Sequence, residues 1–378
     1  MDEPQLELLR EKLTTSAEPV TAARIADLVR VEGLALGSAT AAQLVKRLRD
    51  ELVGLGPLQQ FADAEGVTDV ILDGSRTVWT DGEQGLRSTG VQLESEEQAR
   101  TLARRLIAAA GARLDEGHPC ADGRIGPYRI HAVIPPVAVE GTLISVRVAR
   151  RSTASLEQLA NQWEARDEWL KVIGAVVGQR MNCLISGATG SGKTALLGAM
   201  LGEVPAGERI VVVEDTTELM PVHPHVVHLQ QRQGNVEGAG QVDMGQLVRQ
   251  TLRMRPDRLI VGECRGAELR DFLTAMNTGH QGAAGTVHAN SSDAVPARLA
   301  AMGALAGMTP ETVAVQAAAA LDVVIHVQRH GTRRTPVELS QVAYRDGRLQ
   351  MLPVLTWEHH SLRRGPGWQT GPWQELLR

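Results

Sequence analysis

Residues 182–201, NCLISGATGSGKTALLGAML, constrain the fold of this chain more than any other segment. The apolar run at 183–186 is typical of a buried strand, the glycines that follow allow a tight turn, and an apolar helical pattern comes next. Further short β-rich runs, RIVVVED, HVVHLQ, RLIVGE and GAAGTVHA, alternate with helical segments. This alternation is typical of a doubly wound, largely parallel sheet with helices on both faces. We therefore expect an α/β domain built around this strand, turn and helix.

The turn itself, GATGSGKT, fits the phosphate-loop pattern G-x-x-x-x-G-K-[ST] throughout. Backbone N–H groups in such a loop point at phosphate oxygens, and the N-terminus of the following helix adds positive potential. Lys193 is the only lysine after position 171 in an arginine-rich chain. A compact ammonium fits this loop better than a planar guanidinium, and the hydroxyl of Thr194 suits Mg²⁺. We therefore predict that nucleotide phosphates contact Gly187, Ala188, Thr189, Gly190, Ser191, Gly192, Lys193 and Thr194.

Acidic residues end two of the other apolar runs. Glu214 and Asp215 end RIVVVED, and Glu263 ends RLIVGE. Ligands bind beyond the carboxyl ends of parallel strands, so these acids are expected near the phosphates. Hydrolysis of a nucleotide needs both a metal anchor and a group that activates water, and carboxylates serve both needs. His288 ends GAAGTVHA and is expected near the γ-phosphate or the attacking water.

The length of 378 residues favours two domains with a short extension. Leucines at helical spacing predict a helical extension over residues 1–53. We expect an α/β domain over 54–152, the nucleotide-binding domain over 153–355, and a tail over 356–378. Within the first domain, VTDVILDG, TVWTDGEQGLRST, YRIHAVIPP and TLISVRVAR are predicted strands.

Local signals place several turns and caps. Asp81-Gly82 and Asp346-Gly347 are dipeptides typical of hairpin turns. Ser95 and Gln98 form a capping-box pattern at the start of a predicted helix.

Composition excludes several classes of protein. The three cysteines, Cys120, Cys183 and Cys264, are too few and too scattered for a disulfide framework or a zinc site, and we expect them to be buried apolar residues. No secretory signal and no apolar run long enough to span a bilayer is evident, so we expect a protein that is cytoplasmic or that sits on a membrane through a partner. The formal net charge of -5 and the aromatic content of 3% disfavour a nucleic-acid partner.

The ordered segments GATGSGKT, VVVEDTTEL, LRMRPDRLIVGECRG and GAAGTVHANS resemble a set of four motifs. In order and spacing they are similar to the Walker A motif, Asp box, Walker B motif and His box of the type II/type IV secretion ATPase superfamily. The Tad/CpaF-type ATPases of tight-adherence pilus machinery resemble the chain most. The resemblance implies a C-terminal RecA-like P-loop ATPase domain preceded by a smaller N-terminal α/β domain of PAS-like type.

The same resemblance implies roles for the site residues. Lys193 and Thr194 would hold the phosphates of ATP and Mg²⁺, Glu214 would orient or deprotonate water, and Glu263 would hold the Mg²⁺ shell. His288 would sense the γ-phosphate. The sequence does not decide which of Glu214 and Glu263 acts on water and which holds Mg²⁺. Arginines that neutralise the transition state would come partly from the first domain of the same or a neighbouring subunit. The candidates are Arg124, Arg129 and Arg147, with Arg253, Arg255 and Arg265 flanking the Glu263 strand.

The resemblance also implies a homo-hexameric ring that works with an inner-membrane platform protein to drive pilus assembly or secretion. Two alternatives remain open. One is a nucleic-acid motor, such as a helicase or a DNA-conjugation ATPase, and the other is a nucleotide-binding scaffold that does not hydrolyse.

Overall fold

The computed structural model divides the chain into two compact units, Met1–Arg150 and Arg151–Arg378. It describes residues 22–31, 45–46, 48–50, 53–82, 85–148, 154–232, 240–331, 333–358 and 361–376. Helix α2 (Ala22–Val31) lies in the region expected to be helical, with Ile25 and Val29 buried. The first part of the predicted helical extension, residues 1–21, falls outside the described residues. Within the described part, no helix is both long and apolar enough to cross a membrane.

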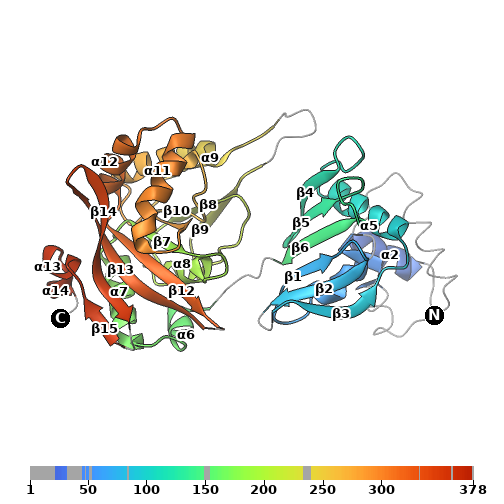
Figure 1. Ribbon diagram of the computed structural model, residues 1–378, viewed down its shortest axis with the longest axis horizontal. Coiled ribbons are helices and arrows are strands. Elements are labelled where there is room, and N and C mark those ends of the chain that lie inside the picture. The colour runs from blue at the N-terminus through green and yellow to red at the C-terminus, as the bar shows by residue number, and fades with distance from the viewer. Residues whose placement is uncertain are drawn as a thin grey trace. The chain divides into compact units, whose positions relative to one another are not determined.

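The first unit is an antiparallel sheet with helices on one face (Figure 1). Its six strands run in the order β3-β2-β1-β6-β5-β4. The 14-residue helix α5 (Glu96–Ala109) begins at the predicted cap, where Ser95 Oγ accepts from the Gln98 N–H, and it buries Leu102, Leu106 and Ile107. Before it come the 3₁₀ turn η1 (Gly56–Leu58) and α4 (Gln59–Ala62). The strands are β1 (Val67–Leu72), β2 (Thr77–Gly82), β3 (Arg87–Gln92), β4 (Cys120–Ile125), β5 (Tyr128–Val133) and β6 (Leu143–Val148).

Two details of the first unit differ from expectation. Asp81 and Gly82 are paired with β1 at the end of β2, and the Gly82 oxygen accepts from the Gly85 N–H, so the Asp-Gly dipeptide ends the strand and does not form the centre of the turn. Strand β4 was not predicted because Asp122 and Gly123 disfavour strands. Gly123 is nevertheless suited to its place, since a Cβ there would lie 2.5 Å from the Cβ of Ala110.

The second unit contains a sheet of nine strands in the order β15-β14-β13-β12-β7-β11-β10-β8-β9. The strands from β12 to β9 in this order are all parallel, which confirms the predicted doubly wound sheet. Their bounds are β7 (Cys183–Gly187), β8 (Ile210–Glu214), β9 (Val226–Gln230), β10 (Arg258–Val261), β11 (Ala284–His288) and β12 (Val323–His330). Strands β7, β8 and β10 are buried along their whole length, as apolar runs between two helix layers should be.

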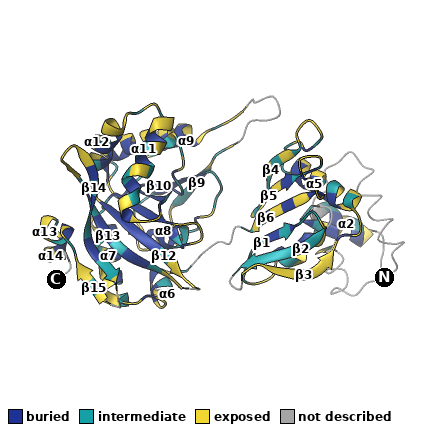
Figure 2. Ribbon diagram, viewed as in Figure 1, coloured by how far each residue is buried: buried dark blue, intermediate teal, exposed yellow. Residues whose placement is uncertain are grey.

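Helices cover both faces of this sheet, and each layer has its own apolar core (Figure 2). On one face lie α6 (Leu156–Ala160), α7 (Arg166–Gly178) and α8 (Lys193–Gly202), with Trp169 fully buried. The other face packs against α9 (Met244–Thr251), α10 (Glu268–Asn277), η2 (Ser292–Ala294), α11 (Val295–Leu305) and α12 (Pro310–Ala320). The phosphate-loop strand β7 therefore lies in the interior of the domain.

The C-terminal strands extend the sheet with antiparallel pairs. Asp346 and Gly347 both have positive φ and form the predicted turn between β13 (Arg333–Arg345) and β14 (Arg348–Glu358). Residues 356–378, expected to be a tail, instead contribute the edge strand β15 (Ser361–Arg364) and two short helices, α13 (Gly367–Thr370) and α14 (Trp373–Leu376). Trp373 is only 1% exposed and joins the core of the second unit, which holds this segment on the sheet.

One of the three cysteines does not follow expectation. Cys183 and Cys264 are buried as expected, but Cys120 is exposed at the start of β4, an edge strand of the first unit.

Candidate functional site

The loop between β7 and α8 has the conformation that its glycines allow. Gly190 and Gly192 have φ of 72° and 98°, a region that residues with a Cβ rarely adopt. Lys193 follows as the first residue of α8 and is only 6% exposed. Its Nζ donates to the backbone oxygens of Gly187, at 2.9 Å, and Ala188, at 2.8 Å. The ammonium is thus held inside the loop by carbonyls, in the place where a phosphate-loop lysine meets phosphate oxygens.

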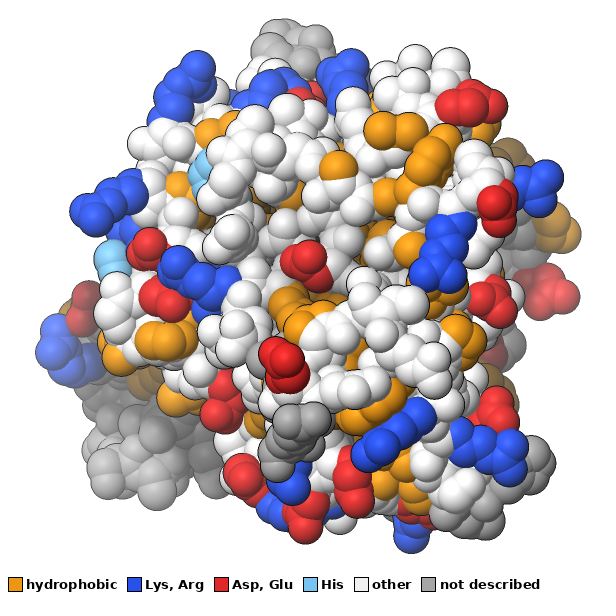
Figure 3. Space-filling model, turned by 90° about the vertical axis from the view of Figure 1, so that its left-hand side faces the viewer, with side chains coloured by type: hydrophobic (Ala, Val, Ile, Leu, Met, Phe, Trp, Pro, Cys, Tyr) orange, Lys and Arg blue, Asp and Glu red, His pale blue; other side chains and the backbone are white. Residues whose placement is uncertain are grey.

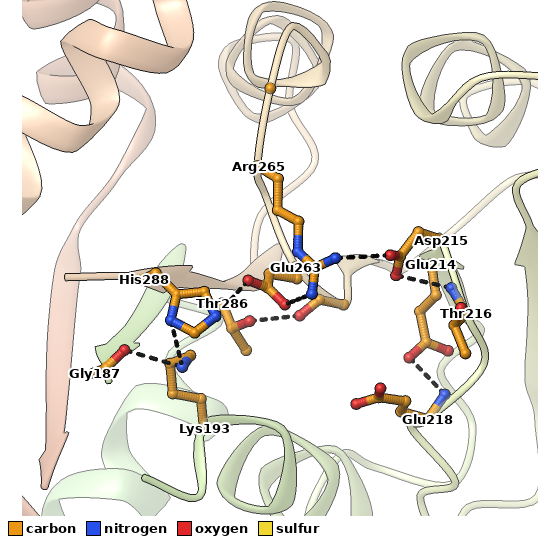
Figure 4. Close-up of polar contacts among 12 residues, drawn as sticks. Gly187, Lys193, Glu214, Asp215, Thr216, Glu218, Glu263, Arg265, Thr286 and His288 are labelled. Carbon is orange, nitrogen blue, oxygen red and sulfur yellow. Dashed lines mark hydrogen bonds and ion pairs between the residues drawn. The ribbon is translucent and has the colours of Figure 1, made fainter. Parts of the chain in front are cut away.

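Sheet order brings the predicted acids and histidine to the same edge. Strands β7, β11, β10 and β8 are consecutive neighbours and parallel, so their carboxyl ends lie side by side. Figure 4 shows His288 above Lys193 with Glu263 beside it. Lys193 Nζ lies 3.4 Å from His288 Nδ1, and His288 Nε2 lies 2.8 Å from Glu263 Oε1. Segments separated by 95 residues of sequence therefore meet at one charged cluster.

Arg265 connects the acids of two strands. It donates from Nη2 to Glu263 at 2.6 Å and from Nη1 to Asp215 at 3.0 Å. Burial acts to raise the pKa of Glu263, but the hydrogen bond and charge of Arg265, with the charges of His288 and Lys193, lower it overall. The pKa of His288 is lowered, chiefly by burial, so its imidazole is neutral at pH 7. The cluster therefore holds an ionised Glu263 between two cations and a neutral ring.

Glu214 has a different environment from Glu263. It is 3% exposed, and its Oε1 accepts from the backbone N–H groups of Glu218 and Leu219, both at 3.0 Å. Within the described residues its Oε2 has no hydrogen-bond partner. Burial raises the pKa of Glu214 to about 7, and the two backbone hydrogen bonds only partly oppose this. A carboxyl group with a pKa near neutrality and one unused oxygen is suited to accept a proton.

The residue between β10 and Glu263 is Gly262, and the structure shows why glycine suits this position. Many phosphate-loop enzymes have an aspartate at this position. A Cβ on Gly262 would lie 2.5 Å from Cγ of Glu214. The side chain of Glu214 therefore occupies the space that a larger residue would need.

The residues present fit a magnesium ion bound together with phosphate. The described residues contain no group of three or more His, Cys, Asp or Glu side chains that could hold a metal alone. Mg²⁺ is commonly held by one or two protein oxygens together with phosphates and water. The Thr194 hydroxyl in the first turn of α8 and the ionised Glu263 carboxylate supply such oxygens.

The candidate arginines divide into three groups. Arg124, Arg129 and Arg147 lie opposite one another on β4, β5 and β6 of the first unit, and Arg147 Nε lies 3.2 Å from Asp69 Oδ1. They are on the face of the sheet opposite to that of buried Ile130. Arg265 lies in the cluster. By contrast, the exposed Arg253 and Arg255 precede β10, at the opposite end of that strand from Glu263.

One contact at the phosphate loop had no signal in the sequence. Arg334, at the start of β13, donates from Nε to the backbone oxygen of Gly190 at 3.1 Å. The two residues are 144 positions apart, and Arg334 is one of many arginines, so neither spacing nor residue type distinguishes it. Only the pairing of β12 with both β7 and β13 brings it to the loop.

The sheet and the phosphate loop define a P-loop α/β protein. The structure of the pilus retraction motor PilT with bound ADP shares the fold, with a TM-score of 0.52 and 20% identity over 74% of this chain and 80% of that chain. A Mycobacterium tuberculosis protein, provisionally named as a conjugal transfer protein, is 46% identical in sequence to this chain. The match extends over 327 residues, which are 84% of this chain and 93% of that protein. The type IV secretion system protein PtlH of Bordetella pertussis is 33% identical over 278 residues, 64% of this chain and 80% of that protein.

Residues 51–350 match the type II/IV secretion system protein family. The chain belongs to this family, which confirms the superfamily indicated by the four sequence motifs.

Proposed function

We propose that the chain hydrolyses ATP in a Mg²⁺-dependent reaction that powers pilus assembly or protein secretion. The observation that carries the proposal is the cluster at the carboxyl edge of the second-unit sheet. There Lys193 of the phosphate loop lies next to His288 and Glu263, with Glu214 on the strand beyond (Figure 4). The cluster combines a phosphate-binding loop with the ionised Glu263 and with Glu214, whose pKa is raised. Hydrolysis of a phosphoanhydride requires these groups.

In this proposal Lys193 exchanges its bonds to the Gly187 and Ala188 oxygens for the β- and γ-phosphate oxygens. Thr194 and Glu263 would hold Mg²⁺, which supplies neutralisation of charge on the phosphates. Glu214 takes the proton of the attacking water on Oε2 while the backbone N–H groups of Glu218 and Leu219 hold Oε1. Glu263 is the poorer base of the two acids, because its pKa is lowered and that of Glu214 is raised.

His288 and the arginines complete the proposed site. His288 contacts both Lys193 and Glu263, so it is placed to respond when phosphate binds between them. The row formed by Arg124, Arg129 and Arg147 in the first unit would supply guanidinium groups to the transition state, from the same or a neighbouring subunit.

The relatives support the cellular part of the proposal. PtlH is named as a type IV secretion system protein, and PilT as a pilus retraction motor. We propose by analogy a homo-hexameric ring at the cytoplasmic face of the inner membrane, bound to a membrane platform protein of a Tad/CpaF-type system.

A nucleic-acid motor is the second candidate, because the Mycobacterium tuberculosis relative and others are named for conjugal transfer. Figure 3 shows one face of the molecule, where acidic and basic side chains are interspersed with neutral and hydrophobic ones. Such a face disfavours tracking along a phosphate backbone. Turnover that is stimulated by DNA and weakens steeply with salt would favour this candidate.

The test is phosphate release by the purified chain with ATP and Mg²⁺. We expect turnover in the wild type, loss of turnover in Lys193→Ala, and loss of turnover with retained ATP binding in Glu214→Gln. Lys171→Ala is the matched control, since Lys171 is exposed on α7. A wild type that binds ATP without releasing phosphate, or a Lys193→Ala variant with normal turnover, would contradict the proposal.

A further inference from the structure

The hairpin of β12 and β13 brings two arginines to the phosphate loop. Arg334 donates from Nε to the Gly190 oxygen, and its side-chain carbons pass over Gly192, where a Cβ would lie 3.0 Å from Cδ. Arg329 approaches the same loop, and a Cβ on Gly190 would lie 3.8 Å from its Nη1. The backbone of Arg334 is held in turn, because its carbonyl oxygen accepts from Nε1 of the buried Trp163 at 3.0 Å. The guanidinium group of Arg334 is therefore held at the loop by a hydrogen bond, and that of Arg329 lies close to the same loop.

Arg329 and Arg334 lie directly opposite each other on the two strands. Like charges in opposite positions of an antiparallel pair repel and destabilise the sheet. Arg329 uses Nε to bind the Gly331 oxygen, and Arg334 uses Nε to bind the Gly190 oxygen. Within the part of the chain that the structure describes, the Nη nitrogens of both residues have no hydrogen-bond partner. Two adjacent guanidinium groups with unused donors, side by side at a phosphate loop, are suited to bind an anion.

The sheet order shows which end of a nucleotide lies near this pair. Glu263 follows β10, whereas His288 and Glu214 are the last residues of β11 and β8, and all three strands lie on one side of β7. The γ-phosphate that is cleaved must point toward these residues. Strand β12 lies on the other side of β7 and leads into the hairpin. Because the triphosphate is a linear chain, its α-phosphate and nucleoside lie toward the hairpin.

We propose that Arg334 and Arg329 bind the α-phosphate of the nucleotide and form the wall of the site opposite the catalytic acids. This inference rests on the proposal that the phosphate loop binds ATP. It adds a contact made within one subunit by a hairpin outside the four sequence motifs. Because the α-phosphate does not change during hydrolysis, the pair contributes to binding equally before and during the reaction.

The experiment compares three ligands with the full chain by isothermal titration calorimetry in the presence of Mg²⁺. ATP and inorganic triphosphate both fill the α position, whereas pyrophosphate fills only two phosphate positions. The variants are Arg334→Met and Arg329→Met, which keep an unbranched apolar stem without the guanidinium. Arg345→Met, an exposed arginine at the other end of β13, is the control.

Each of the two variants should bind ATP and triphosphate about 10- to 100-fold more weakly, the effect of losing a hydrogen bond to a charged group. Pyrophosphate affinity should be unchanged, and Arg345→Met should behave as the wild type. In steady-state assays the KM for ATP should rise while kcat is retained.

Other outcomes would overturn the inference in distinct ways. Equal weakening of all three ligands would show that the arginines only support the loop. Arg329→Met is decisive here, because in the described part of the chain Arg329 makes no hydrogen bond to the backbone of the phosphate loop. Weakening for ATP alone would assign the contact to the nucleoside, and unchanged affinities would exclude any contact. If the wild type bound none of the three ligands, the proposed function itself would fail.

Discussion

Glu214 and Glu263 show how the environment separates two residues of the same type. Glu214 is buried, its Oε2 has no hydrogen-bond partner among the described residues, and its pKa is raised to about 7. Glu263 pairs with Arg265 and His288, and its pKa is lowered. At neutral pH one acid is therefore poised to exchange a proton while the other stays ionised, and such a separation of pKa values supports the proposed roles of Glu214 as base and Glu263 as metal ligand.

The pKa of Glu214 predicts how activity and stability depend on pH. If Glu214 is the base, kcat/KM, which reports the pKa values of the free protein, should rise with pH through an inflection near 7. Its folded pKa is raised above its unfolded value, so the folded state binds the proton more tightly and the stability of the protein falls as pH rises from about 4.5 to about 7. Glu214→Gln removes this loss, and its melting temperature should exceed that of the wild type more at pH 8 than at pH 5. Equal differences at the two pH values would contradict the assignment.

Gly262 offers a second test at the scale of a single residue. Gly262→Ala should push Cγ of Glu214 out of position, because the new Cβ would come within 2.5 Å of it. We expect kcat to fall while nucleotide affinity is retained, and overpacking should cost about 1–3 kcal/mol of stability. Phosphate release and calorimetric ATP binding, measured on the same preparation, separate the two effects. Normal turnover in Gly262→Ala would show that the placement of Glu214 is not critical.

At the scale of elements, two glycines inside helices of the second unit have different surroundings. Gly174 in the middle of α7 is exposed and has open space around its Cα, whereas Gly303 of α11 is buried against Val313 of α12. A Cβ on Gly303 would collide with Cγ2 of Val313, so glycine at this position lets the two helices approach closely.

The two glycines form a matched pair for a stability test. Gly174→Ala should stabilise the protein by about 0.5–1 kcal/mol, because alanine loses less backbone entropy in a helix. Gly303→Ala should lower stability despite the same propensity gain, and Val313→Ala should lessen the harm caused by Gly303→Ala in the double variant. Thermal unfolding of the four proteins gives the comparison. Stabilisation by Gly303→Ala would mean that α11 and α12 are not closely packed there.

At the scale of the whole molecule, the proposed function requires the arginine row of the first unit and the cluster of the second unit, in the same or in neighbouring subunits, to act on one phosphate. Arg147→Ala should lower kcat by about 10³-fold or more if its guanidinium reaches the transition state, as removal of an arginine finger does. Mixing Arg147→Ala with Glu214→Gln tests whether it acts between subunits. Complexes formed from the two inactive variants should regain phosphate release, since some interfaces then combine an intact arginine with an intact base. No recovery in mixed complexes confirmed by mass measurement would show that Arg147 acts within its own subunit.

Local sequence determined much of this protein. The run at 182–201 predicts β7, the phosphate loop and α8, because apolar periodicity, glycine freedom and a single lysine act over a few residues. The acids and His288 were identified for a similar reason, since each ends an apolar strand and parallel strands end at one edge. Asp346-Gly347 likewise predicts its own hairpin turn.

The tertiary structure decided what depends on neighbours distant in sequence. The packing of Glu214 against Gly262 depends on the pairing of β8 with β10, and the approach of Arg334 to Gly190 depends on the pairing of β12 with both β7 and β13. The same arrangement leaves Oε2 of Glu214 without a hydrogen-bond partner among the described residues. Strand β4 and the segment around Trp373 were not predicted, because their local composition favours loops. Packing of β4 against α5, and of Trp373 in the core of the second unit, outweighs this local preference. Sequence patterns record which chemical groups are present and how short segments fold, but burial and charge pairing depend on contacts between segments, and these set the pKa and position of each group.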